Sequence, residues 1–234
     1  MTIEVGGVKV AELSVEALLG RPLNSYERRF APPKLFVAGK IPIPLKVQRV
    51  AVVGTRQPTR QAVEFTEEFV RKLVEKHVAV VSGLARGVDT TAHKTAIKHG
   101  GKTIAVLGTP LNRFYPPENR ELQLTIMQEH LAISQFPPNH VTGRPDFILR
   151  NRTMALISDA SIIVEASQTS GALSQGWEAI RLGRPLYIAP FVLEQKLDWP
   201  KKMMEYGAKI FENIDDIIDL LPSHEYEWSS ILER

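Results

Sequence analysis

One stretch of the sequence combines glycines with an arginine, an aspartate and a histidine, a set of residue types suited to binding an anion. It runs over residues 82–93 as SGLARGVDTTAH, directly after an apolar run at 78–81 and ahead of a helical pattern. A strand that ends in a glycine-rich turn and leads into a helix brings free backbone N–H groups and the positive end of the helix dipole to one place. Arg86 adds a full positive charge there.

The other residues of this stretch have both structural and chemical interpretations. Gly83 and Gly87 permit a close backbone approach and a positive φ. Asp89 is placed to cap the helix, and His93 follows one turn later, so both side chains can face the same side. We expect Asp89 and His93 to support the turn as a hydrogen-bonded pair rather than to act as catalysts. The simplest alternative is a tight turn that only connects a strand to a helix.

The rest of the chain predicts the framework that holds this turn. Continuous apolar runs are typical of strands that are buried on both faces, as in parallel sheets. Helical patterns fill the gaps between these runs, so each strand and helix together take roughly 30 residues, the usual size of a βαβ unit. We therefore predict an α/β fold with a doubly wound, mostly parallel sheet. The predicted strands are 50–53, 78–81, 103–107, 131–134, 161–164 and 185–189, and the predicted helices are 59–76, 89–99, 119–130, 147–156 and 171–182.

Before and after this region the pattern is less regular. Residues 1–48 contain several prolines and are predicted to form a lead-in that packs on the main domain, with one small helix in the amphipathic stretch 8–19 and an edge strand at 35–38. The main domain is predicted to span residues 49–221 and to finish with a short strand near 209–211 and a helix at 214–221. Residues 222–234 are expected to be a tail.

Composition narrows the function classes. The 234 residues carry a formal net charge of +3 and include no cysteine, which excludes disulfides, thiolate catalysis and cysteine-based zinc sites. The six histidines show no metal-ligand spacing. Because the N-terminus lacks the pattern of a signal peptide and no apolar run is long enough to span a bilayer, we expect a cytoplasmic protein without a membrane partner. We expect neither a metal nor a cofactor.

In an open α/β sheet, ligands bind beyond the carboxyl ends of the strands, so the strand ends are considered together. They carry arginines at three places, and the guanidinium group is suited to holding phosphate through paired hydrogen bonds. The expected ligand is therefore a nucleotide or a nucleic-acid backbone. The candidate phosphate-binding residues are Gly54, Thr55, Arg56, Ser82, Gly83, Arg86 and Gly108, together with Arg150, Asn151 and Arg152 ahead of the fifth strand.

For two further segments, a ligand-binding role and a purely structural role are equally compatible with the sequence. Ser170 and Gly171 precede a helix and could hold a phosphate, or Ser170 could be an ordinary N-cap. Arg113, Phe114 and Tyr115 form a basic and aromatic cluster that could stack on unpaired bases, or the aromatic residues could fix the start of the next helix.

Blocks of residues in a fixed order resemble the DNA-processing protein A (DprA/Smf) family. The resemblance covers about residues 26–189, and the block at 82–89 is the most diagnostic. After the fifth strand the family commonly has Ser-Gly-Ser-Leu where this chain has Ser-Gly-Ala-Leu at 170–173, and the chain also departs from the family pattern after Ala189. The blocks are 53–56, 82–89 with 92–93, 105–108 with 115–119, 134–138, 147 with 150–152, and 164–166 with 170–171.

The resemblance implies an extended Rossmann-like domain, in a minimal form, that binds single-stranded DNA and forms a homodimer. It also implies that the protein protects this DNA and delivers it to a RecA-type recombinase during DNA uptake or recombination, and it implies no chemical reaction. By motif position the DNA-phosphate pocket would contain or adjoin Gly54, Arg56, Ser82, Gly83, Arg86, Arg150 and Arg152.

The alternative is a sensor or an enzyme that uses the same pocket for a free nucleotide, as in the nucleoside-monophosphate phosphoribohydrolases. Glu165 or Glu178 would then be the acid or base, and Ser170 with Gly171 would cradle the phosphate. The chain lacks the Pro-Gly-Gly-x-Gly-Thr block of those enzymes. A mononucleotide that competes with DNA and loses its base would favour this alternative.

Overall fold

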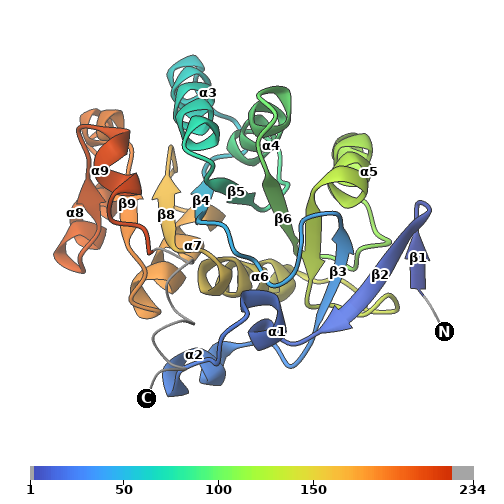
Figure 1. Cartoon of the computed structure of the whole chain (residues 1–234). Coiled ribbons are helices and arrows are strands. Elements are labelled where there is room, and N and C mark those ends of the chain that lie inside the picture. Colours follow the sequence, from blue (N-terminus) through green and yellow to red (C-terminus); the bar gives the residue numbers. More distant parts are fainter. Residues whose placement is uncertain (1–2, 223–234) are drawn as a thin grey trace.

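The sheet is the centre of the molecule, and it has ten strands in the order β1-β2-β3-β7-β6-β5-β4-β8-β9-β10 (Figure 1). In this computed structural model, which describes residues 3–222, every pairing from β7 to β10 is parallel, and β1, β2 and β3 add antiparallel pairings at one side. The doubly wound, mostly parallel sheet is confirmed. The strands are β1 (Ile3–Val5), β2 (Val8–Leu13), β3 (Leu35–Gly39), β4 (Arg49–Val53), β5 (Ala79–Ser82), β6 (Thr103–Leu107), β7 (Leu131–Ser134), β8 (Ala160–Ile163), β9 (Leu186–Ile188) and β10 (Lys209–Ile210).

Helices cover both faces of the sheet (Figure 1). Helices α3, α4 and α5 lie on one face, and α6 and α7 lie on the other. None of the helices within residues 3–222 is both long enough and apolar enough to cross a membrane. The helices are α1 (Val15–Leu19), α2 (Ser25–Phe30), α3 (Arg60–Glu75), α4 (Val88–Lys98), α5 (Arg120–Glu129), α6 (Arg144–Ile157), α7 (Gly171–Arg181), α8 (Asp198–Glu205) and α9 (Ile214–Ile218), with 3-10 turns η1 (Pro117–Asn119) and η2 (Pro190–Gln195).

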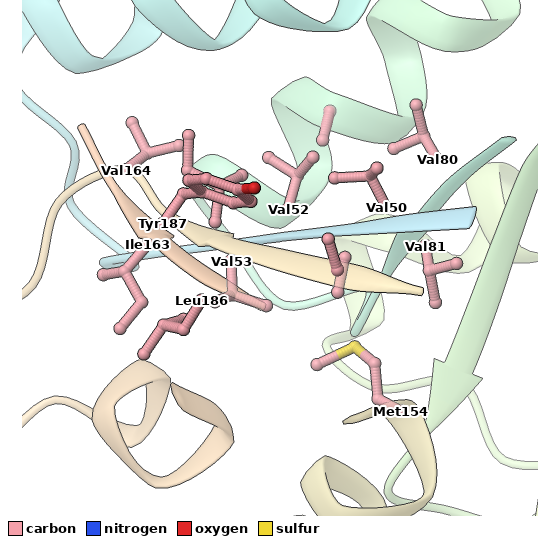
Figure 2. Packing of buried hydrophobic residues seen from close by; sticks show 14 of the residues in the cluster. Val50, Val52, Val53, Val80, Val81, Met154, Ile163, Val164, Leu186 and Tyr187 are labelled. Atoms are coloured by element: carbon pink, nitrogen blue, oxygen red, sulfur yellow. The ribbon is translucent and has the colours of Figure 1, made fainter. Parts of the chain in front are cut away.

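The core follows from the apolar runs of the central strands. All five residues of β4 are buried, as are all four of β5. Figure 2 shows the cluster extending from Val80 and Val81 of β5 across the valines of β4 to Leu186 and Tyr187 of β9, with Met154 of α6 on one side. Side chains on both faces of these strands are covered, which is why the sequence runs are continuous rather than alternating.

The N-terminal segment differs most from its prediction. The strand expected at the edge is β3, and it lies inside the sheet between β2 and β7. The stretch 8–19 is not one small helix, because its first part forms β2 and only its end forms α1. Helix α6 begins at Arg144, three residues before the predicted start, with Pro145 in its first turn. The proposed division at residue 48 stays a prediction, although β2 and β3 belong to the main sheet, and the tail from residue 223 lies outside the described residues.

Candidate nucleic-acid interface

The order of the strands creates a crevice beside β4. The chain passes from β4 through α3 to β5 on one side, and it returns through α6 to β8 on the other side of β4. Ligands bind at such a switch point, beyond the carboxyl ends of the strands. Two adjoining cavities lie there and share Thr55, Arg56, Ala85, Phe147 and Arg150.

We name each cavity after a residue on its wall. The Tyr115 cavity, of about 490 Å³, is also lined by Gly83, Arg86, Gly108, Pro116 and Pro117. The Ser170 cavity, of about 380 Å³, is also lined by Gly54, Asn151, Ser167, Thr169, Gly171 and Gln175. Together they bring most of the sequence-predicted residues to one place. Those residues are Gly54, Thr55, Arg56, Gly83, Arg86, Gly108, Arg150, Asn151, Ser170 and Gly171.

The turn after β5 is held by close packing that requires glycine. A Cβ atom on Gly83 would lie 1.8 Å from Nη1 of Arg150. Gly87 has a φ of 75°, which favours glycine, and it precedes the first residue of α4. Ser82 is fully buried, and its hydroxyl donates to the carbonyl of Val52 at 2.7 Å, so it fixes β5 to β4 rather than facing either cavity.

Arg150 is a buried cation beneath this turn. Its Nη1 donates to the carbonyls of Gly83 at 2.5 Å and Val106 at 2.9 Å, and its Nε donates to Oδ1 of Asn151 at 3.0 Å. Burial lowers the pKa of Arg150, and the nearby Asp89 carboxylate acts against that shift. Arg150 therefore lines both cavities while it ties the ends of β5 and β6 to α6.

Arg56 and Arg86 are the two exposed cations of the site. Arg86 forms an ion pair with Glu118 at the mouth of the Tyr115 cavity, and its side chain is 63% exposed. Arg56 is also exposed, and it lies where the two cavities meet. A surface ion pair such as that of Arg86 contributes little to stability, so this guanidinium can exchange Glu118 for another anion at small cost.

Arg152 is not brought to the cavities. Its Nε donates to Glu178 at 3.1 Å, and its guanidinium lies over the Phe30 ring at 5.0 Å. Arg150 and Arg152 are two residues apart, so they leave α6 on nearly opposite sides. The expectation that Arg152 contributes to the phosphate pocket is therefore wrong, because the helix turns its side chain away from the side that carries Arg150.

Asp89 lines the Ser170 cavity and His93 is fully buried beside it in α4, and no hydrogen bond joins the two side chains within the described residues. The N-cap of α4 is Gly87, and Asp89 instead accepts from the backbone N–H of Ala85 at 3.3 Å. Burial raises the pKa of Asp89, and the Arg150 charge lowers it in part. His93 Nδ1 lies 2.7 Å from Oγ1 of Thr103, which itself donates to a backbone carbonyl, so the imidazole donates to Thr103.

The buried His93 predicts acid sensitivity. Burial lowers its pKa from 6.5 to about 3, so below pH 6.5 the unfolded chain binds a proton that the folded protein does not. Stability must then fall as the pH falls through this window, by about 1.4 kcal/mol between pH 8 and pH 5.5. Urea denaturation at both pH values should show this loss in the wild type and a smaller loss in His93→Gln. Equal losses in the two proteins would contradict the assignment.

The two glutamates that a nucleotide-cleaving enzyme would use as acid or base are both engaged in hydrogen bonds or ion pairs with other side chains or the backbone. Glu165 accepts from the backbone N–H of Thr59 at 2.8 Å and from Nε2 of Gln195 at 3.1 Å. Glu178 pairs with Arg152 and Arg181. Neither glutamate lines the Tyr115 or the Ser170 cavity. Within residues 3–222 no group of three or more histidines and carboxylates is placed to hold a metal ion.

Phe147 belongs to the site although no sequence pattern assigns it a role there. This residue lines both cavities, and its ring lies against Gly108, where a Cβ atom would approach Phe147 Cδ1 to 2.5 Å. The sequence feature that could have indicated this contact is Gly108 at the end of a strand, because a glycine permits an aromatic ring to lie close to the backbone. Ser170 does cap α7, since its Oγ accepts from the N–H of Ala172 at 3.3 Å.

The fold and the crevice define a Rossmann-like protein with a cationic pocket at the switch point of its sheet. The family model described as DNA recombination-mediator protein A matches residues 22–222. The chain belongs to this family.

Comparison with individual relatives supports the same family. The chain is 37% identical to DNA processing protein DprA of Streptococcus pneumoniae over 189 residues, which is 80% of this chain and 66% of the relative. It is 30% identical to the Bacillus subtilis DprA over 199 residues, covering 85% of this chain and 67% of the relative. The chain therefore spans about two thirds of the length of these relatives.

Solved structures agree as well. The pneumococcal DprA structure superposes with a TM-score of 0.77 and 32% identity, covering 91% of this chain and 74% of that one. A DprA structure from Helicobacter pylori, described by its single-stranded DNA binding mode, superposes with a TM-score of 0.74 and 26% identity, covering 94% and 97%. A molybdenum cofactor binding protein of Rippkaea orientalis shares the fold, with a TM-score of 0.53 and 18% identity over 80% of this chain and 99% of that one.

Proposed function

We propose that this protein binds single-stranded DNA at the crevice beside β4, through the phosphate groups of the strand. The observation that carries this proposal is the presence of two exposed arginines, Arg56 and Arg86, at the mouth of one cavity at the carboxyl ends of parallel strands. Family membership supports DNA as the ligand, and the similarity to the Helicobacter pylori DprA, which binds single-stranded DNA, supports a single strand.

The remaining phosphate contacts are assigned to backbone and polar groups near these arginines. Gly83 and Gly108 bring the main chain close to the Tyr115 cavity without side chains of their own. Thr55, Asn151, Ser170 and Gly171 line the adjoining cavity. Hydroxyl and amide groups of this kind contact phosphates and hold a strand in register without reading its sequence.

The test is a fluorescence anisotropy titration of a labelled single strand and of the matching duplex, each at about 50 and 200 mM salt. We expect tighter binding of the single strand, little sequence preference, and an affinity that falls steeply with salt. Equal affinity for duplex and single strand, or affinity that does not respond to salt, would refute the proposal. Unlabelled mononucleotide is the control for the nucleotide alternative, and we expect it not to compete.

We further infer that the protein acts in the cytoplasm as a homodimer and passes its DNA to a RecA-type recombinase during DNA uptake or recombination. Support comes from membership of a family described as recombination mediators. Light scattering should give twice the chain mass of 26.2 kDa. Recombinase filaments should form faster on DNA that carries this protein, and an unchanged rate would contradict this part of the proposal.

A further inference from the structure

A surface rich in arginine lies around α2, on the side of the sheet that α6 and α7 cover (Figure 1). Two buried glutamates form its base, Glu27 of α2 and Glu178 of α7. Six arginines lie around them, and each keeps part of its side chain in solvent. We call this set the α2 surface, and its arginines are Arg21, Arg28, Arg29, Arg152, Arg181 and Arg184.

The two carboxylates do not neutralise this surface. Glu27 accepts from Arg21 at 2.7 Å and from Arg184 at 2.6 Å, and Glu178 is shared in the same way by two arginines. Burial raises the pKa of Glu27, but its hydrogen bonds and the charges of Arg21 and Arg184 lower it by more, so this carboxyl group stays ionised. Each negative charge therefore serves two positive charges and lies beneath them.

Arg28 and Arg29 add two charges that no carboxylate within residues 3–222 pairs with. Nη2 of Arg28 donates to the carbonyl of Leu23 at 3.1 Å, and the Arg29 guanidinium lies 6.0 Å from the centroid of the Phe30 ring. The Arg152 guanidinium lies over the same ring at 5.0 Å. The α2 surface therefore presents six guanidinium groups against two buried carboxylates.

The α2 surface begins close to the crevice. Asn151 lines the Ser170 cavity, and its Nδ2 donates at 3.1 Å to the carbonyl of Gly171, the first residue of α7. The next residue of α6, Arg152, holds Glu178 about two turns further along α7. With a rise of about 1.5 Å per residue, Glu178 lies about 10 Å from Gly171 along the helix, and Arg181 lies about 15 Å from it. A strand that leaves the Ser170 cavity can thus reach the α2 surface within a few nucleotides.

Charge and continuity together specify the ligand. Guanidinium groups hold phosphates through paired hydrogen bonds, and here they lead away from the crevice along the outer side of α6 and α7. We propose that the α2 surface is a second contact for the same single-stranded DNA, and that it binds the phosphates of the nucleotides next to those in the crevice. This inference rests on the proposed function. An acidic protein segment is the other ligand that such arginines can take, and the experiment separates the two.

The experiment compares a thymidine strand of about 20 nucleotides with one of about 4, which is short enough to be held by the crevice alone. Arg29→Ala/Arg181→Ala removes two exposed guanidinium groups from the α2 surface. This variant should bind the long strand about 3- to 30-fold more weakly, the effect of losing two exposed charge contacts. Its slope of log K against log salt concentration should fall by about 1.4 on the long strand. Its affinity for the short strand should equal that of the wild type, and Arg29→Lys/Arg181→Lys should keep the wild-type slope.

Arg71→Ala/Lys76→Ala is the matched control, because these side chains near the end of α3 are 42% and 54% exposed and lie on the opposite face of the sheet. It should bind both strands as the wild type does. An unchanged slope in Arg29→Ala/Arg181→Ala, which is the result expected if the surface takes an acidic protein segment, would overturn this inference and leave the proposed function standing. An equal fall in the control, or a weakened hold on the short strand, would do the same. Failure of the wild type to bind the long strand would overturn both.

Discussion

Replacement of Arg150 by methionine is expected to lower the free energy of unfolding by about 3–5 kcal/mol, the usual cost of removing one member of a buried charged network. The guanidinium donates to the carbonyls of Gly83 and Val106, and methionine leaves both without that donor. It also removes the positive charge that counters the effect of burial on Asp89. The pKa of Asp89 should rise further in this variant. Its loss of stability relative to the wild type should therefore grow as the pH rises above the pKa that Asp89 has in the folded wild type, which is itself higher than the ordinary aspartate value.

Chemical denaturation followed by circular dichroism measures this loss. Arg144→Met is the control, because Arg144 is an exposed residue at the start of the same helix and the substitution removes the same charge. The control should stay within about 0.5 kcal/mol of the wild type. If Arg150→Met is as stable as the control, Arg150 does not hold the turn after β5.

A buried ion pair lies at the opposite end of the strands, and breaking it should lower the free energy of unfolding by a similar amount. Arg49 at the start of β4 and Asp159 before β8 are both almost fully buried, and Nη2 of Arg49 donates to Oδ1 of Asp159 at 2.9 Å. Asp159 Oδ2 also accepts from the backbone N–H of Arg49 at 2.8 Å. Burial lowers the pKa of Arg49, and Asp159 opposes that shift. Asp159→Asn should cost about 3–5 kcal/mol, because it keeps the shape and removes the compensating charge.

Glu129→Gln provides the comparison, since its partner Lys40 forms an ion pair whose side chains are more than half exposed. Exposed pairs contribute about 0–1 kcal/mol, so this variant should unfold almost as the wild type does. Thermal and urea denaturation should give the same ranking for the two variants. A loss below about 1 kcal/mol in Asp159→Asn is the value typical of an exposed ion pair, and it would contradict the burial of the Arg49 charge.

The central fold could be predicted because burial leaves a direct trace in the sequence. Strands such as β4 and β5 are covered on both faces, so they appear as continuous apolar runs. Strand β2 of the lead-in has no such trace. None of its six residues is buried, and its pairing with β3 depends on contacts between residues far apart in the sequence. Strand β3 itself does carry this trace, because its four apolar residues at 35–38 are all buried, and the expectation of an edge strand missed only its pairing with β2.

The site could be predicted as far as the topology fixes it. Parallel strands end at one edge, so the sequence predicts that Arg56 and Arg86 meet, and both line the Tyr115 cavity. The direction of a side chain on a helix depends on its exact phase, which is why the sequence does not decide between Arg150 and Arg152. Nor does it decide between stacking and packing for Tyr115, because the exposure of this ring depends on where the loop after β6 folds back toward α6.

The salt dependence of single-stranded DNA binding tests the central claim most directly. Removal of one phosphate-binding arginine should reduce the slope of log K against log salt concentration by about 0.7. Arg56→Ala and Arg86→Ala should each weaken binding by about 1–3 kcal/mol, and the double variant should lower the slope by about 1.4. Arg71→Ala/Lys76→Ala removes the same charge near the far end of α3 and should leave the slope unchanged. A slope that is unaltered in the Arg56/Arg86 double variant, or equally reduced in both double variants, would contradict a phosphate site at this crevice.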